Sequence, residues 1–88
     1  MDTIKLLNKT KNGMYVAIIL NNGIRCPSLY MGQPTSGVYQ FIIDDTGVYR
    51  MTAGYIKSHN IKIDQTLNSE ELFQIGVIVN QVMKKEVK

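Results

Sequence analysis

The chain has 88 residues, which is enough for one hydrophobic core and too few for two. Hydrophobic residues make up 44% of it and charged residues 19%, a balance that excludes an intrinsically disordered chain. The net charge of +3 permits a nucleic-acid partner but falls short of a dedicated nucleic-acid binder. The single cysteine excludes an internal disulfide, and no apolar run approaches the roughly 20 residues of a membrane span. We expect one cytoplasmic domain over residues 1–88, without a secretory signal.

The first 26 residues predict two consecutive β-hairpins. Residues 3–9 form the first expected strand, and residues 14–20, which are apolar and rich in β-branched side chains, form the second. Segments 11–13 and 21–23 both end in Asn-Gly, the pair that favours the positive φ angles of tight hairpin turns. A third strand is expected to begin at Ile24.

Residues 27–37 predict a long loop, because they hold both prolines of the chain and two of its seven glycines. Long loops in compact domains often carry binding residues. Tyr30 lies within this segment, and its side chain combines a flat apolar ring with a polar tip that suits an interface. We therefore expect Tyr30 to be exposed in the loop and to contact a partner.

Three further strands are expected before the last third of the chain. Residues 38–43 and 48–52 are joined by an Asp-Asp-Thr-Gly segment at 44–47, whose adjacent carboxylates are typical of a hairpin turn and not of a metal site. A single helical turn is expected around Tyr55. Residues 60–64 alternate in polarity, which predicts the final strand.

The last third of the chain predicts one α-helix over about residues 69–86. Asn68 and Glu71 have the spacing of a capping box, in which each residue satisfies a backbone amide of the other. Acidic residues follow the start of the helix, and Lys84 and Lys85 lie near its end, as the helix dipole favours.

The apolar arc of this helix, centred near Val79, is about 260° wide at ~100° per residue, whereas a small sheet covers about half of a helix. Gly76 lies inside the arc, and its cost of roughly 1 kcal/mol in a helix interior indicates close approach of another backbone. We therefore expect a homo-oligomer in which the helix contacts the same helix of another copy; the alternative is a deeper groove within one monomer. The expected oligomer interface consists of Phe73, Gly76, Val79, Asn80 and Met83.

Residues 48–63 run from a strand through one helical turn that carries Tyr55 into a final strand. This layout resembles the end of a Src-homology-three-like barrel. The resemblance implies a mainly β (α+β) chain that forms a small antiparallel β-barrel, here with one C-terminal α-helix; an open sheet backed by the helix is the alternative. The acidic loop and the tryptophan of that family are missing, so the resemblance does not imply binding of proline-rich peptides.

No pattern in the sequence points to catalysis, a cofactor or a metal ion. His59 is the only histidine, so a nucleophile–histidine pair would require it, and Cys26 at a strand end is typical of a small buried apolar residue. Residues 32–37 contain two glycines but match no phosphate-binding loop, although their backbone amides could cradle an anion. We expect a protein that is not an enzyme.

Five tyrosines in a chain without tryptophan are the most suggestive binding residues. Together with nearby cations they form a possible basic and aromatic face for a protein or a nucleic acid. The alternative is that they are ordinary strand residues at the rim of the sheet. The candidate binding residues are Tyr30, Arg25, Tyr49, Arg50, Tyr55 and Lys57.

Three functions follow from these observations. The first is a small protein–protein interaction module, regulator or inhibitor that acts as a homo-oligomer, as in an accessory protein of a phage or mobile element. The second is a nucleic-acid-binding β-barrel that uses Arg25, Arg50, Lys57 and Lys62. The third is a sequestering protein that holds a small anionic or nucleotide ligand between subunits.

Overall fold

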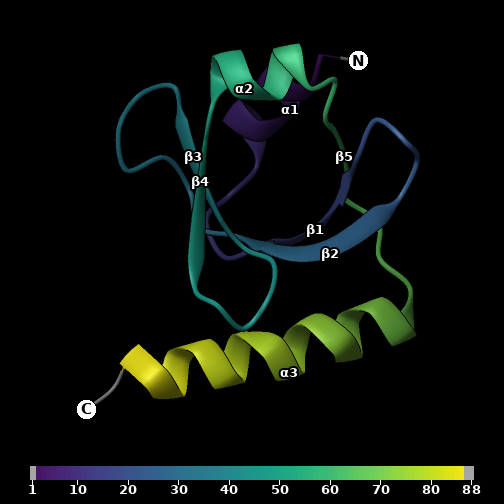
Figure 1. Cartoon of the computed structure of the whole chain (residues 1–88), viewed down its shortest axis with the longest axis vertical. Helices are drawn as coiled ribbons and strands as arrows, with labels where there is room; N and C mark the ends of the chain where they lie inside the picture. The colour runs from purple at the N-terminus through teal and green to yellow at the C-terminus, as the bar shows by residue number, and fades with distance from the viewer. Residues whose placement is uncertain (1, 87–88) are drawn as a thin grey trace.

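Residues 2–86 are described by the computed structural model, which combines an antiparallel sheet with α-helices (Figure 1). The strands are β1 (Tyr15–Ile19), β2 (Arg25–Tyr30), β3 (Val38–Ile42), β4 (Val48–Thr52) and β5 (Lys62–Asp64). The helices are α1 (Thr3–Lys9), α2 (Ala53–Ser58) and α3 (Ser69–Glu86). Within residues 2–86, no helix is both long and apolar enough to cross a membrane.

The five strands form one sheet in the order β4-β3-β2-β1-β5, with every neighbouring pair antiparallel. β1 pairs with β2 from Tyr15↔Leu29 to Ile19↔Arg25, whereas β3 pairs only with the last two residues of β2. β2 therefore links two halves of the sheet that diverge from each other (Figure 1). The predicted antiparallel sheet with a C-terminal helix is confirmed, but β4 and β5 do not pair, so the sheet is not closed into a barrel.

Two short helices cover the open side of the sheet. α2 contacts β4, α1 contacts β5, and the two helices contact each other opposite β1 and β2 (Figure 1). The Thr3 hydroxyl donates a hydrogen bond of 2.8 Å to the Ile61 carbonyl, which fixes α1 beside the start of β5. α1 and α2 thus enclose the core between β4 and β5, the two edge strands, which do not pair with each other.

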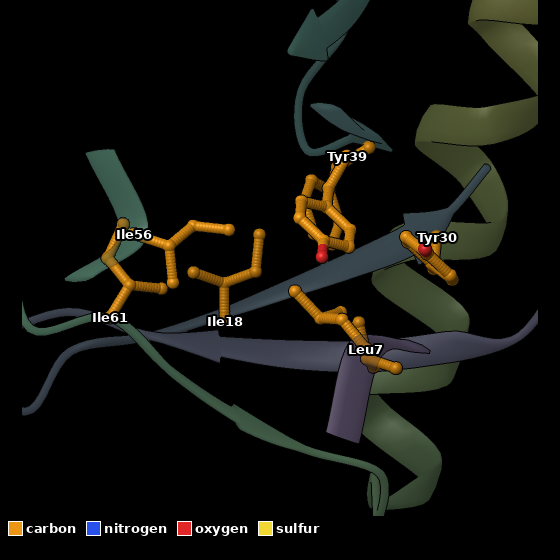
Figure 2. Packing of buried hydrophobic residues seen from close by; sticks show 8 residues of the cluster. Leu7, Ile18, Tyr30, Tyr39, Ile56 and Ile61 are labelled. Atoms are coloured by element: carbon orange, nitrogen blue, oxygen red, sulfur yellow. The ribbon is translucent and has the colours of Figure 1, made fainter. Parts of the chain in front are cut away.

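The main core fills the space between the sheet and these two helices. Figure 2 shows side chains from α1, β1, β2, β3 and α2 gathered there. The rings of Tyr30 and Phe41 lie 5.4 Å apart in a tilted arrangement, and the Tyr39 hydroxyl donates to Asn8 Oδ1 at 2.9 Å. The buried members are Leu7, Val16, Ile18, Tyr30, Tyr39, Phe41, Ile56 and Ile61. None of them belongs to α3.

α3 packs on the opposite face of the sheet, against β2 and β3 (Figure 1). A second apolar cluster joins Val82 to Leu29 and Ile42, with Ile78 and Val79 packed at its border. The start of the helix is the predicted capping box. The Glu71 amide donates to Asn68 Oδ1 at 2.8 Å, and the Asn68 amide donates to Glu71 Oε1 at 3.2 Å.

Residues 3–9 form helix α1, so the prediction of a first strand and of a first hairpin is wrong. The Asp2 carboxylate accepts a hydrogen bond of 2.9 Å from the Ile4 amide and caps the helix. Ile4 and Leu7, three residues apart, both pack toward the main core. The predicted turn before β1 does form, with Gly13 at φ +96°, but it joins a helix to a strand.

The predicted loop over 27–37 is shorter than expected, because β2 continues through Tyr30. Pro27 is tolerated there because it lies opposite Ala17 of β1, in the part of β2 that has no second strand beside it. The chain leaves the sheet only after Tyr30, and Gly32 and Gly37 adopt positive φ angles in the remaining loop.

The other predicted elements are confirmed. β1 and β2 form a hairpin through the turn at 21–23, and β3 and β4 form another through residues 44–47. The helical turn around Tyr55 is α2, residues 62–64 form β5, and α3 spans the predicted range.

Candidate interaction surfaces

The side of α3 that faces away from the sheet exposes several large apolar side chains. Ile75 and Val82 are buried against the sheet, whereas Phe73 is 73% exposed. A shallow groove runs along this side, which we term the outward face of α3. It is lined by Leu72, Phe73, Gly76, Val77, Asn80, Gln81 and Lys84.

No contact or backbone angle within residues 2–86 requires a glycine at position 76. A Cβ atom placed there would meet no heavy atom within 4 Å, and its backbone is not in the left-handed region. Glycine therefore destabilises the helix by about 1 kcal/mol without relieving a contact among the described residues. The position suits a surface that another backbone approaches closely.

The structure places four of the predicted oligomer residues, Phe73, Gly76, Asn80 and Met83, on the side of α3 that solvent reaches. Val79 is the exception, because it is partly buried beside the cluster that docks α3 on the sheet. Val79 therefore lies apart from the other four predicted interface residues, at the border between the sheet-facing and the solvent-facing sides of α3. The exposed apolar side of α3 is centred closer to Phe73 than to Val79.

The predicted basic and aromatic face is not formed as one surface. Tyr30 is only 1% exposed and lies in the main core, so its expected position in an exposed loop is wrong. Tyr49 is half-exposed, but its hydroxyl donates to Asp44 Oδ2 at 2.8 Å and closes the β3–β4 turn. Hydrogen bonds from Thr46 and Tyr49 lower the pKa of the Asp44 carboxyl. Arg50 lies across from Gln40, whose amide oxygen, turned toward it, accepts from Arg50 Nε at 2.9 Å.

Arg25 joins β2 to β5 and to the first turn of α3. Its Nη1 lies 2.8 Å from Asp64 Oδ2, and its Nε and Nη2 donate to the Glu71 carboxylate at 3.0 and 3.1 Å. Nη2 also donates to the Thr66 carbonyl at 3.0 Å. These bonds raise the pKa of Arg25 above its ordinary value and lower the pKa values of Asp64 and Glu71. Arg25 is therefore a structural contact and not a cation available to a ligand.

The Arg25 contacts predict a loss of stability in acid. The pKa values of Asp64 and Glu71 are lower in the folded protein than in the unfolded chain. Their ion pairs with Arg25 therefore stabilise the fold above about pH 4, and this stabilisation is lost as the pH falls through the pKa values of the folded protein. Arg25→Gln is expected to lower the Tm by roughly 5 °C near pH 7 and by a smaller amount near pH 3. Thermal denaturation across this range measures both effects.

The matched control is Arg50→Gln, which removes an exposed arginine that faces a neutral amide. It should leave the pH dependence of the Tm unchanged. An equal Tm difference between wild type and Arg25→Gln at both pH values would show that the ion pairs do not contribute to stability.

Tyr55, one of the predicted binding residues, forms a second exposed surface with His59, which is not among them. Their rings stack with centroids 3.9 Å apart. They lie beside the tip of the β1–β2 hairpin in a hollow that Leu20, Asn21, Asn22 and Ile61 also line. The sequence does contain a signal for this pair. Tyr55 and His59 are four residues apart, and on a helical turn this spacing places their side chains on the same side of the helix. Lys57 of the predicted site instead borders a different hollow, between α1 and β5.

Cys26 and His59 are the only cysteine and histidine of the sequence. Burial raises the pKa of the Cys26 thiol, which disfavours the reactive thiolate. His59 Nδ1 lies 3.0 Å from the Tyr55 carbonyl, at the end of α2. Within residues 2–86, no group of three or more His, Cys, Asp and Glu side chains is placed to hold a metal ion.

Comparison of the chain with protein-family models, curated proteins and solved structures gives no match.

Proposed function

We propose that the protein is a small, non-enzymatic protein–protein interaction module or regulator, located in the cytoplasm, that acts as a homo-oligomer through the outward face of α3. The observation that carries this proposal is the exposure of Phe73, flanked by the half-exposed Leu72 and Val77. Burial of apolar surface contributes about 25 cal/mol per Å², so covering this face with a protein surface is favourable.

We further propose that the fold is an open relative of the Src-homology-three-like barrel. The strand order β4-β3-β2-β1-β5 keeps the first and last strands adjacent, and a short helix lies between β4 and β5. α1 and α2 take the place of the missing β4–β5 pairing. This proposal concerns the fold alone.

Nucleic-acid binding is the second candidate function. The exposed Tyr55–His59 stack favours it, since an aromatic platform suits the stacking of a nucleotide base. The engagement of Arg25 with two carboxylates and the burial of Tyr30 disfavour it.

Phe73→Glu tests the main proposal. Wild type is expected to be an oligomer by light scattering, and Phe73→Glu is expected to weaken self-association about a hundredfold, because it places a charge at the centre of the contact. The fold should persist, since Phe73 is absent from both core clusters.

Gln74→Glu is the matched control, because it adds the same charge at the next, exposed position of α3, outside the groove. It should keep the wild-type mass. A wild-type protein that stays monomeric at high concentration would contradict self-association. A mass increase upon addition of short DNA, lost at moderate salt, would favour nucleic-acid binding instead.

A further inference from the structure

We propose that two copies of the protein pair as a dimer in which their α3 helices run antiparallel about a two-fold axis near Val77. Glu70 of each copy then faces Lys84 of the other. This inference rests on the proposed self-association and adds the number of copies, their orientation and the contacts that fix them.

The spacing of three residues along α3 supplies the symmetry. Glu70, Val77 and Lys84 are each seven residues apart, so they lie close to one line along the helix. All three side chains are exposed. Reversing the helix about Val77 exchanges the positions of Glu70 and Lys84, so this line is complementary to its own antiparallel copy.

The contacts within one chain explain why these two charges remain for a partner. The other acidic residue of the first turn, Glu71, binds Arg25, and the other lysine of the last turn, Lys85, donates to the Asp45 carbonyl at 3.0 Å. Among residues 2–86, neither Glu70 nor Lys84 forms an ion pair. The first and last turns of α3 therefore each present one charge beside the outward face, negative at Glu70 and positive at Lys84.

Charge selects the antiparallel orientation over the parallel one. A parallel pair would place Glu70 beside Glu70 and Lys84 beside Lys84 and would align the two helix dipoles. The antiparallel pair forms two attractive contacts instead, because the two-fold axis repeats each contact.

The shape of the groove agrees with this register. Gly76 and Val77 lie at the proposed axis, and Gly76 leaves open space where another residue would carry a side chain. The two helices can therefore approach closely at the crossing point. In this register position 73 of one copy is level with position 81 of the second, so Phe73 lies over the part of the second copy's groove that Asn80 and Gln81 line.

Charge reversal tests the orientation. The variants are Glu70→Lys, Lys84→Glu and the double variant, and the dimer dissociation constant is measured by sedimentation at low salt. Each single variant turns both attractive contacts into repulsive ones and is expected to raise the dissociation constant about tenfold. The double variant restores opposite charges and is expected to return to within about twofold of wild type.

The double variant also controls for folding, since it carries both changes at the ends of the helix dipole. If the single variants dimerise as well as wild type, or if the double variant is as weak as the single variants, the antiparallel pairing is wrong while self-association stands. A monomeric wild type overturns both proposals, and a wild-type mass larger than a dimer overturns the two-fold arrangement.

Discussion

Tyr30→Ala is expected to remove about 3–5 kcal/mol of the protein's stability. Tyr30 is 1% exposed, and its ring packs on Phe41 inside the main core. Removing a buried aromatic side chain costs about 3–5 kcal/mol, through lost burial and the cavity that remains. An 88-residue domain has a total stability of roughly 5–10 kcal/mol, so this single change removes a large part of it.

Urea denaturation measures this effect, with Tyr30→Phe as the control. The described structure gives no hydrogen bond to the Tyr30 hydroxyl, so Tyr30→Phe is expected to change the free energy of unfolding by less than about 1 kcal/mol. Tyr30→Ala should shift the unfolding midpoint strongly to lower urea. A Tyr30→Ala protein with the wild-type midpoint would show that Tyr30 is not a core residue.

The position of Tyr30 in β2 also shows why the proline and glycine content of residues 27–37 predicts too long a loop. Prolines and glycines predict a loop because they weaken strands. Pro27 lies in the strand nonetheless, since β3 reaches only the last two residues of β2. Whether a proline fits at position 27 thus depends on which residues of β2 are paired with β3, and the sequence around Pro27 does not show this.

The N-terminal helix was missed for a related reason. Within residues 3–9, Ile4 and Leu6 fit the alternation of a strand, whereas Ile4 and Leu7 fit a helix. Seven residues contain too few repeats to separate the two periods. The main core decides between them, because both Ile4 and Leu7 pack into it.

α3 was predicted well because its signals are local. Asn68 and Glu71 cap each other three residues apart, and the helix begins where they do. The direction in which the helix faces was harder to predict. A wide apolar arc does not show which part of it meets the sheet. The sequence therefore assigns Val79 to the oligomer interface, whereas in the structure it is partly buried beside the cluster that joins α3 to the sheet.

The binding residues were the least predictable part. Arg25 finds its carboxylates 39 and 46 residues along the chain, and such pairs depend on the tertiary fold. The sequence identified the outward face of α3 as apolar beyond the needs of one chain, and that feature supports the proposed function.

Val82→Glu is expected to undock α3 from the sheet. Val82 is 2% exposed and packs with Leu29 and Ile42, so a carboxylate there loses its hydration and gains no partner in this apolar cluster. The expected cost is about 3 kcal/mol or more. The main core contains no residue of α3, so the loss falls first on the helix and its contact with β2 and β3.

Amide hydrogen exchange separates undocking from general unfolding. In Val82→Glu, the amides of α3 should exchange much faster than in wild type, while those of β1 keep most of their protection. Phe73→Glu provides the contrast, because it adds the same charge to the other side of the same helix and should leave α3 protected in the monomer. Equal loss of protection in α3 and β1 of Val82→Glu would mean that both clusters form one cooperative unit. The outward face of α3 would then be held in place by the whole fold, so a variant that undocks the helix would also lose the main core.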